Sequence, residues 1–299
     1  MNKVVAALGG KRAADAFRKT VSGDPTGAPQ WAQQMAIGND VGLFGPDSAV
    51  WEVHGCISTL VGGIRALLMQ AAHPAALTGV AEHSQYDTDP LGRLERTTRW
   101  LTITTFGSTE AIEREARRVN KLHSHVKGQY PAKDGNAQSY SAQDSRHLLW
   151  VHCAFTDSFL QAHLELGYPI VRGADRYVHE WSKSAAPLGL ASAPQSALEL
   201  EETIAGFVSN EVAAIAMTPP IVKFILTPPF SKGGLFFYRI LANAAIATID
   251  EPFLKVLGLK KRSKIWLRVS RKLLDFLSYM LGHESPSQKI ARARIQALQ

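Results

Sequence analysis

The sequence predicts an all-α protein, folded as a single helical domain of about eight to ten helices. Apolar residues recur every three or four positions through most of the 299-residue chain, which is the spacing that places them on one face of a helix. Residues that cap helices, chiefly Ser, Asp, Pro and Gly, separate these apolar stretches. Runs that alternate apolar and polar residues and end in turn dipeptides, as strands do, are scarce.

Capping residues set the boundaries of the expected helices. Asp47 or Ser48 begins the first strong helix, and the His73-Pro74 pair interrupts it, because a proline disfavours helical backbone in the residue before it. Gly107 separates the next two helices. In order, helices are expected over residues 47–72, 74–84, 90–106, 108–128, 141–167, 173–183, 194–217 and 233–257, with a basic helix inside 255–299.

Nothing in the composition marks a boundary between domains. Hydrophobic residues make up 45% of the chain, which is enough for one large core, and there are no internal repeats. The most linker-like stretch, residues 127–143, is flanked by strong helical patterns, so we expect a long loop within one domain. Residues 1–40 are expected to form an N-terminal extension.

The net charge of +7 is concentrated at the C-terminal end. Residues 255–299 contain eleven Lys or Arg and two acids, so the rest of the chain carries a balance of −2. Basic and apolar residues are interleaved there at helical spacing, which fits either a helix packed on the core or an amphipathic helix that docks on anionic lipid. No nucleic-acid-binding motif matches, so no nucleic-acid partner is expected.

Several kinds of site are excluded by sequence. Cys56 and Cys153 lie in apolar segments without CxxC spacing, so we expect reduced thiols rather than disulfides or a thiolate zinc site. Signatures of zincins, ferritin-like di-iron bundles, P-loop enzymes, serine hydrolases and dinucleotide-binding enzymes are absent from the sequence. The apolar run before Lys11 is too short for a secretion signal or a membrane span, and a cytoplasmic location is expected.

His123 occupies a position where a core side chain is expected. At 3.6 residues per turn it lies on the apolar face that Ile112 and Ala116 begin, whereas His125 lies on the charged side. An inward imidazole needs either a hydrogen-bonding partner or a metal. Periodicity therefore leaves both a core histidine and a metal ligand open. A single inward histidine in apolar helical surroundings is the least that haem requires.

The helix expected over residues 90–106 carries a polar side of its own. An Arg and a Thr one turn apart, beside a Trp, have the chemistry to bind a carboxylate or a haem propionate. Taken alone, the pattern fits a solvated face equally well. The residues on this side are Arg93, Arg96, Thr97, Trp100 and Thr104.

Three segments together resemble the catalytic domain shared by rubber oxygenases (latex clearing proteins) and fungal MpaB-type oxygenases. They are LLMQAAHPAALTGVAEHSQYDTDPLGRLERTTRWLTITTFG, LHSHVKG and LLWVHCAFTDSFL, in that order. The resemblance covers about residues 45–190 and is weaker in the C-terminal third. It implies a globin-like helical core that binds b-type haem through one axial histidine.

By position, the resemblance implies that His123 is the iron ligand, in the pattern His123-Val126-Gly128. Its Nε2 atom would hold the iron while Nδ1 donates a hydrogen bond to a neighbouring acceptor. The Arg and Thr that members of the family carry near the haem correspond to Arg93 and Thr97.

Other positions match the motifs of the same family. Arg96 stands where the family has an intervening basic residue. Glu82 is the nearest candidate for the distal acidic base, and Glu82 or His83 is expected to move a proton. The further matches, several of which we expect around the cofactor, are His73, Trp150, His152 and Asp157.

The expected function is therefore a haem b-dependent oxygenase or peroxygenase that uses O2 or peroxide on a small apolar or lipid-like molecule. Without a secretion signal, extracellular polyisoprene is not the expected substrate. The alternatives are a non-catalytic haem sensor or carrier, and a helical lipid- or partner-binding protein that uses residues 255–299. A mononuclear non-haem iron or zinc site formed by His73, His83 and His123 ranks last.

Overall fold

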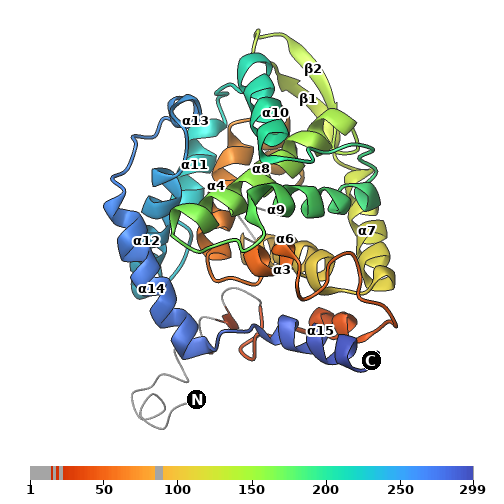
Figure 1. The fold of residues 1–299 in the computed structure, drawn as a ribbon. Coiled ribbons are helices and arrows are strands. Elements are labelled where there is room, and N and C mark those ends of the chain that lie inside the picture. Colours follow the sequence, from red (N-terminus) through yellow and green to blue (C-terminus); the bar gives the residue numbers. More distant parts are fainter. Residues whose placement is uncertain (1–14, 16–17, 20–22, 85–89, 299) are drawn as a thin grey trace.

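The computed structural model describes residues 15, 18–19, 23–84 and 90–298 (Figure 1). Within them the all-α class is confirmed, because the regular structure is helical apart from one pair of short strands. Thirteen α-helices are present in these residues, more than expected. Two expected helices are each divided in two, and the short helices α11 and α15 add to the number.

The first expected helix is one of those divided, into α3 (Ala49–His54) and α4 (Thr59–Ala71). Ser48 caps α3 as expected, since its side chain accepts a hydrogen bond from the backbone N–H of Trp51. The helix ends at Gly55, where any side chain would collide with Gln288 and with the carbonyl of Trp51. Helix α5 (Pro74–His83) begins after His73, also as expected.

Helices α6 (Pro90–Phe106) and α7 (Thr109–His123) pack against each other, with Gly107 between them. Ser108 caps α7 by accepting from the backbone N–H of Ala111. The buried carboxylate of Glu115 on α7 pairs with Arg99 of α6 at 2.8 Å, which ties the two helices together. The expected end of α7 near Gly128 is wrong, because the helix ends at His123 and the chain turns into a strand.

The expectation of a long loop over residues 127–143 is also wrong. It is a β-hairpin of β1 (Lys127–Pro131) and β2 (Ala137–Ser141), antiparallel with Lys127 opposite Ser141. Tyr130 and Tyr140 point inward and pack with Ala75, while the residues between them are mostly exposed. The turn contains Gly135 at a φ of 85°, a conformation that glycine adopts readily.

The long helix α8 (Ser145–Glu165) crosses the middle of the molecule and makes its most extensive contacts with α4 (Figure 1). Asp144 caps it. Helix α9 (Gly173–Trp181) and the 3-10 turns η2 (Ser182–Ser184) and η3 (Ala186–Leu188) follow. Helix α10 (Ala197–Asn210) is shorter than expected. The next helix is α11 (Thr218–Leu226), with Pro219 and Pro220 in its first turn.

The other divided helix is formed by α12 (Lys232–Ala247) and α13 (Glu251–Leu257), which Asp250 and Pro252 separate. The basic C-terminal segment contains α14 (Ile265–Leu281) and α15 (Pro286–Gln296). Figure 1 shows α14 on the outside of the molecule, next to α12, and α15 along the lower edge.

Two large hydrophobic clusters form the core, and α8 contributes to both. The first joins α8 to α4 and to helices α10 to α14. The second joins α8 to α3, α6, α9 and α15, and includes Trp31, Ala32 and Met35 from the 3-10 helix η1 (Gln30–Ala36). Part of the expected N-terminal extension is therefore packed into the core. None of the described helices combines the length and apolarity needed to cross a bilayer.

Candidate functional site

His123 lies at the C-terminal end of α7, where the chain turns towards the hairpin. Its side chain is half-buried, and its Nδ1 atom is shielded from solvent without a hydrogen-bond partner in the structure described. Burial lowers the pKa of His123 from its ordinary value of 6.5, so the imidazole is neutral at physiological pH, the form that binds metals. His125 is exposed. This contrast agrees with the expectation from periodicity.

The turn after His123 packs closely on α5. A Cβ atom at Gly79 of α5 would lie 3.4 Å from Cγ1 of Val126 and 3.2 Å from the ring of Tyr140. A Cβ atom at Gly128 would lie 3.0 Å from the Tyr140 ring and 3.1 Å from Oε2 of Glu82. The missing side chains of the two glycines therefore let α5 and β1 approach, which explains the Val and Gly of the segment LHSHVKG.

Glu82 and His83 lie together at the end of α5, against Tyr140. The Tyr140 hydroxyl donates a hydrogen bond of 2.8 Å to Oε2 of Glu82. Burial, followed by this hydrogen bond, raises the pKa of Tyr140, so the phenol keeps its proton. The His83 ring centroid is 6.4 Å from that of Tyr140. The two residues expected to move protons are thus placed beside the strand that follows His123.

His152 on α8 is a second histidine with an unpaired nitrogen. Its Nε2 atom is buried without a partner within the described residues, and burial lowers its pKa to about 4. The ring is nearly parallel to that of Trp181, at an angle of 10° and a centroid distance of 6.5 Å. His152 is therefore neutral and retains a free site for a donor, an acceptor or a metal.

Buried polar atoms without partners occur on each of the consecutive helices α5 to α8. They are Thr78 Oγ1, Thr104 Oγ1, His123 Nδ1 and His152 Nε2. Buried polar atoms in folded proteins normally have a hydrogen-bond partner, so an unpaired one needs a reason such as an absent ligand or water. These four, of ten such atoms in the described residues, are on the helices that carry the candidate site residues.

His73 and Trp150, both expected at the cofactor, lie together in the core. Nδ1 of His73 accepts from the backbone N–H of Ala76 at 3.4 Å, and Nε2 lies 3.2 Å from Glu211. Both nitrogens are engaged, which fits a role as the cap of α5. The rings of His73 and Trp150 stack at 5.2 Å, and Trp150 is fully buried with its Nε1 atom unpaired.

The polar side of α6 is described only in part. The side chain of Arg93 lies outside the described residues. Arg96 is exposed and Thr97 is half-buried.

Asp157, another position that matches a family motif, forms a buried ion pair. Its Oδ2 atom lies 2.5 Å from Nη1 of Arg65, a residue of α4 that is fully shielded from solvent. Arg65 and Asp157 therefore link α4 to α8.

Tyr140 was not among the expected site residues, because the hairpin that carries it was taken for a loop. The sequence feature that could have predicted the hairpin is the Asp134-Gly135 dipeptide, which is typical of a hairpin turn. It lies between two short segments, each of which contains one buried tyrosine. Thr78 had no signal of its own, since a threonine on an apolar helix face is common.

Comparison with known proteins places the chain in a family. The family model of the ER-bound oxygenase mpaB/B'/rubber oxygenase catalytic domain matches residues 51–278, which include every candidate residue described above. No curated protein and no solved structure matches the chain. Since the matched residues form most of the chain, the protein belongs to the ER-bound oxygenase mpaB/B'/rubber oxygenase catalytic-domain family.

Proposed function

We propose that this protein is a haem b-dependent oxygenase or peroxygenase that acts on a small apolar molecule, and that His123 would hold the haem iron. Membership of a family of oxygenase catalytic domains supports oxygenase activity in general. The observation that carries the finer proposal is the buried, unpaired Nδ1 atom of His123, on an imidazole that burial keeps neutral.

The residues present fit a haem better than a metal ion held by protein alone. Haem iron needs a single protein ligand, and His123 has a ring nitrogen without a protein partner. In the described parts of the chain, no group of three His, Cys, Asp or Glu side chains could hold a metal ion. His73, His83 and His123 are accordingly not assembled into a site, since His73 is buried against Glu211 and His83 is exposed.

One detail differs from the expectation for His123. An acceptor for the Nδ1 proton was expected, and none is found among the described residues. An ordinary core histidine would have such a partner, as His54 and His163 do on both nitrogens. The unpaired Nδ1 therefore supports a ligand role through this atom, instead of through the Nε2 atom that was expected.

When bound, haem would supply activation of O2 or peroxide. The chain's own residues would shape the pocket and move protons. Tyr140 keeps its proton and orients the Glu82 carboxylate, which leaves Glu82 able to accept a proton from a substrate or from water. The imidazole of His83, next to Tyr140, is placed to exchange that proton with solvent.

Apolar surroundings near the C-terminal half of α7 support an apolar substrate. Asn120 of α7 donates a hydrogen bond of 3.1 Å to the carbonyl of Pro187 in η3. Residues on both sides of η3 form a buried apolar cluster with Leu148, at the start of α8. Apolar surroundings of this kind suit a flat macrocycle and a hydrocarbon-like molecule.

The test is turnover by the purified, haem-loaded protein. Haem should bind at about one per chain, and labelled oxygen from O2 or from peroxide should appear in an oxidised apolar substrate. Glu82→Gln should lower turnover and leave haem content unchanged. Glu199 is an exposed carboxylate on α10, and Glu199→Gln should change neither turnover nor haem content. Haem binding without oxidation of any apolar substrate by either oxidant would favour a sensor or carrier and contradict the proposal.

A further inference from the structure

Helix α14 has two apolar faces. The inner one packs on the core through Leu267 and Leu274, which are 5% and 0% exposed. The outer one consists of four large side chains that are 38% to 60% exposed, at spacings of four, seven and three residues, which puts them on one side of the helix. They are Ile265, Val269, Phe276 and Tyr279.

Core packing explains only the first of these faces. Isolated exposed apolar residues are common, but several on one side of a helix indicate a surface that binds something. On the neighbouring helix α12, Phe236 and Phe237 are 63% and 52% exposed, and α12 packs against α14. The helix that packs on α14 therefore also carries exposed large apolar side chains.

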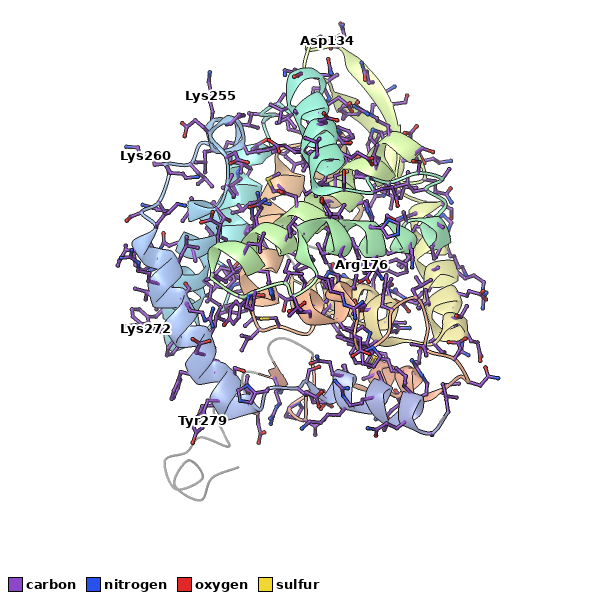
Figure 2. All side chains as sticks on the ribbon, viewed as in Figure 1. Asp134, Arg176, Lys255, Lys260, Lys272 and Tyr279 are labelled. Atoms are coloured by element: carbon purple, nitrogen blue, oxygen red, sulfur yellow. The ribbon has the colours of Figure 1, made fainter. Side chains whose placement is uncertain are left out.

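Cations without partners surround this stripe. Lys260, Arg262, Arg268 and Lys272 are exposed, and none has a hydrogen bond or ion pair within the described residues. From residue 252 to residue 283 the chain has one acid, Asp275, and it is paired with Arg271 at 2.9 Å. Figure 2 places Lys260, Lys272 and Tyr279 along the same outer edge of the molecule.

The first turns of α14 also border a cavity. It has a volume of about 460 Å³ and lies between α14 and the C-terminal end of α8. Its accessible wall is mainly apolar, from residues such as Leu166, Ile265 and Val269, while Arg268 and Lys272 stand at the same site. Apolar walls beside cations suit a molecule with a hydrocarbon part and an anionic head.

We propose that the outer face of α14 docks this protein on anionic phospholipid bilayers. Aromatic and aliphatic side chains would enter the interfacial region, and the unpaired Lys and Arg side chains would contact lipid phosphates. A second copy of the chain is a poorer occupant, because a symmetric contact would set the cations of one copy against those of the other. The inference stands on this surface alone and does not depend on haem.

The experiment is binding of the full chain to vesicles of phosphatidylcholine with phosphatidylserine, compared with phosphatidylcholine alone. Binding should require the anionic lipid and weaken with salt. The triple variant Lys260→Glu, Arg268→Glu and Lys272→Glu should bind at least about 100-fold more weakly, since each cation contributes roughly fivefold. Phe276→Ser with Tyr279→Ser should also release the protein.

A matched control separates this surface from net charge. The triple variant Arg172→Glu, Lys183→Glu and Lys289→Glu changes the charge equally at exposed positions on other elements, and should bind nearly as the wild type does. Equal loss in the two triple variants would overturn the proposal. The proposal would also be overturned, in favour of self-association, if the protein did not bind vesicles but formed a concentration-dependent dimer. In that case the double variant Phe276→Ser with Tyr279→Ser would lose the dimer.

Discussion

The Tyr140 hydroxyl donates a 2.8 Å hydrogen bond to the Glu82 carboxylate, and this bond joins the hairpin to α5 beside the turn that follows His123. Tyr140→Phe removes the bond, so the free energy of unfolding should fall by about 1 kcal/mol in chemical denaturation. In the loaded enzyme, the pH profile of turnover should change while haem content stays the same.

Tyr130→Phe is the control for this change. Its hydroxyl donates to Gln138 within the hairpin, and not to Glu82. If the two variants shifted the pH profile equally, Tyr140 would have no specific role in positioning Glu82.

Two adjacent glycines test the packing of α4 on α8. A Cβ atom at Gly62 would lie 2.6 Å from Cδ1 of Phe159 and 3.2 Å from its Cα, whereas a Cβ atom at Gly63 would meet nothing within 4 Å. Gly62→Ala should therefore destabilise the protein by about 2–3 kcal/mol through overpacking. Gly63→Ala should stabilise it by up to about 1 kcal/mol, since alanine favours the helix. Equal unfolding midpoints in urea would contradict this helix crossing.

The ion pair between Arg65 and Asp157 should be structural. Arg65→Met leaves the Asp157 carboxylate without its partner and should cost about 3–5 kcal/mol in unfolding free energy. Adding Asp157→Asn should recover part of that loss. Loss of haem at unchanged stability in Asp157→Asn would instead place Asp157 in the cofactor site.

His54 makes stability depend on pH. Burial, and secondly the charge of His163, lowers its pKa to about 3 from an ordinary value of 6.5. Between these values the unfolded chain binds a proton that the folded protein excludes. The stabilisation is therefore complete above pH 6.5 and is lost as the pH falls towards 3.

His54→Gln removes this titration. The slope of unfolding free energy against pH should become shallower by up to about 1.4 kcal/mol per pH unit in this range. Denaturation curves at a series of pH values measure it. Parallel profiles for wild type and variant would show that His54 is not buried in neutral form.

Helix positions were largely predictable because their signals are local. Ser48 caps α3 and Gly107 separates α6 from α7 as expected. The hairpin was missed because its strands are five residues each, too short for alternation to stand out. The two helix breaks were missed because the apolar pattern continues through both. The break at Gly55 depends on a tertiary contact, and the break at Asp250-Pro252 depends on capping.

For the candidate site, the sequence could predict which side chains face inward, but not what they contact. Periodicity separated His123 from His125, because burial follows the helix face. It could not show that Nδ1 lacks an acceptor, nor that Glu82 meets Tyr140, since both depend on contacts between distant segments. The sequence likewise could not distinguish the outer apolar face of α14 from the inner one, because composition alone does not show which side packs on the core.

The most direct test of the haem assignment is the absorption spectrum of three purified proteins: the wild type, His123→Ala and His125→Ala. The wild type and His125→Ala should show the same Soret band and haem content, because His125 is exposed. His123→Ala should lose most of the band, and added imidazole should restore it in part. Equal haem content in the two variants, or a colourless wild type after supply of haem, would contradict His123 as the residue that holds the iron.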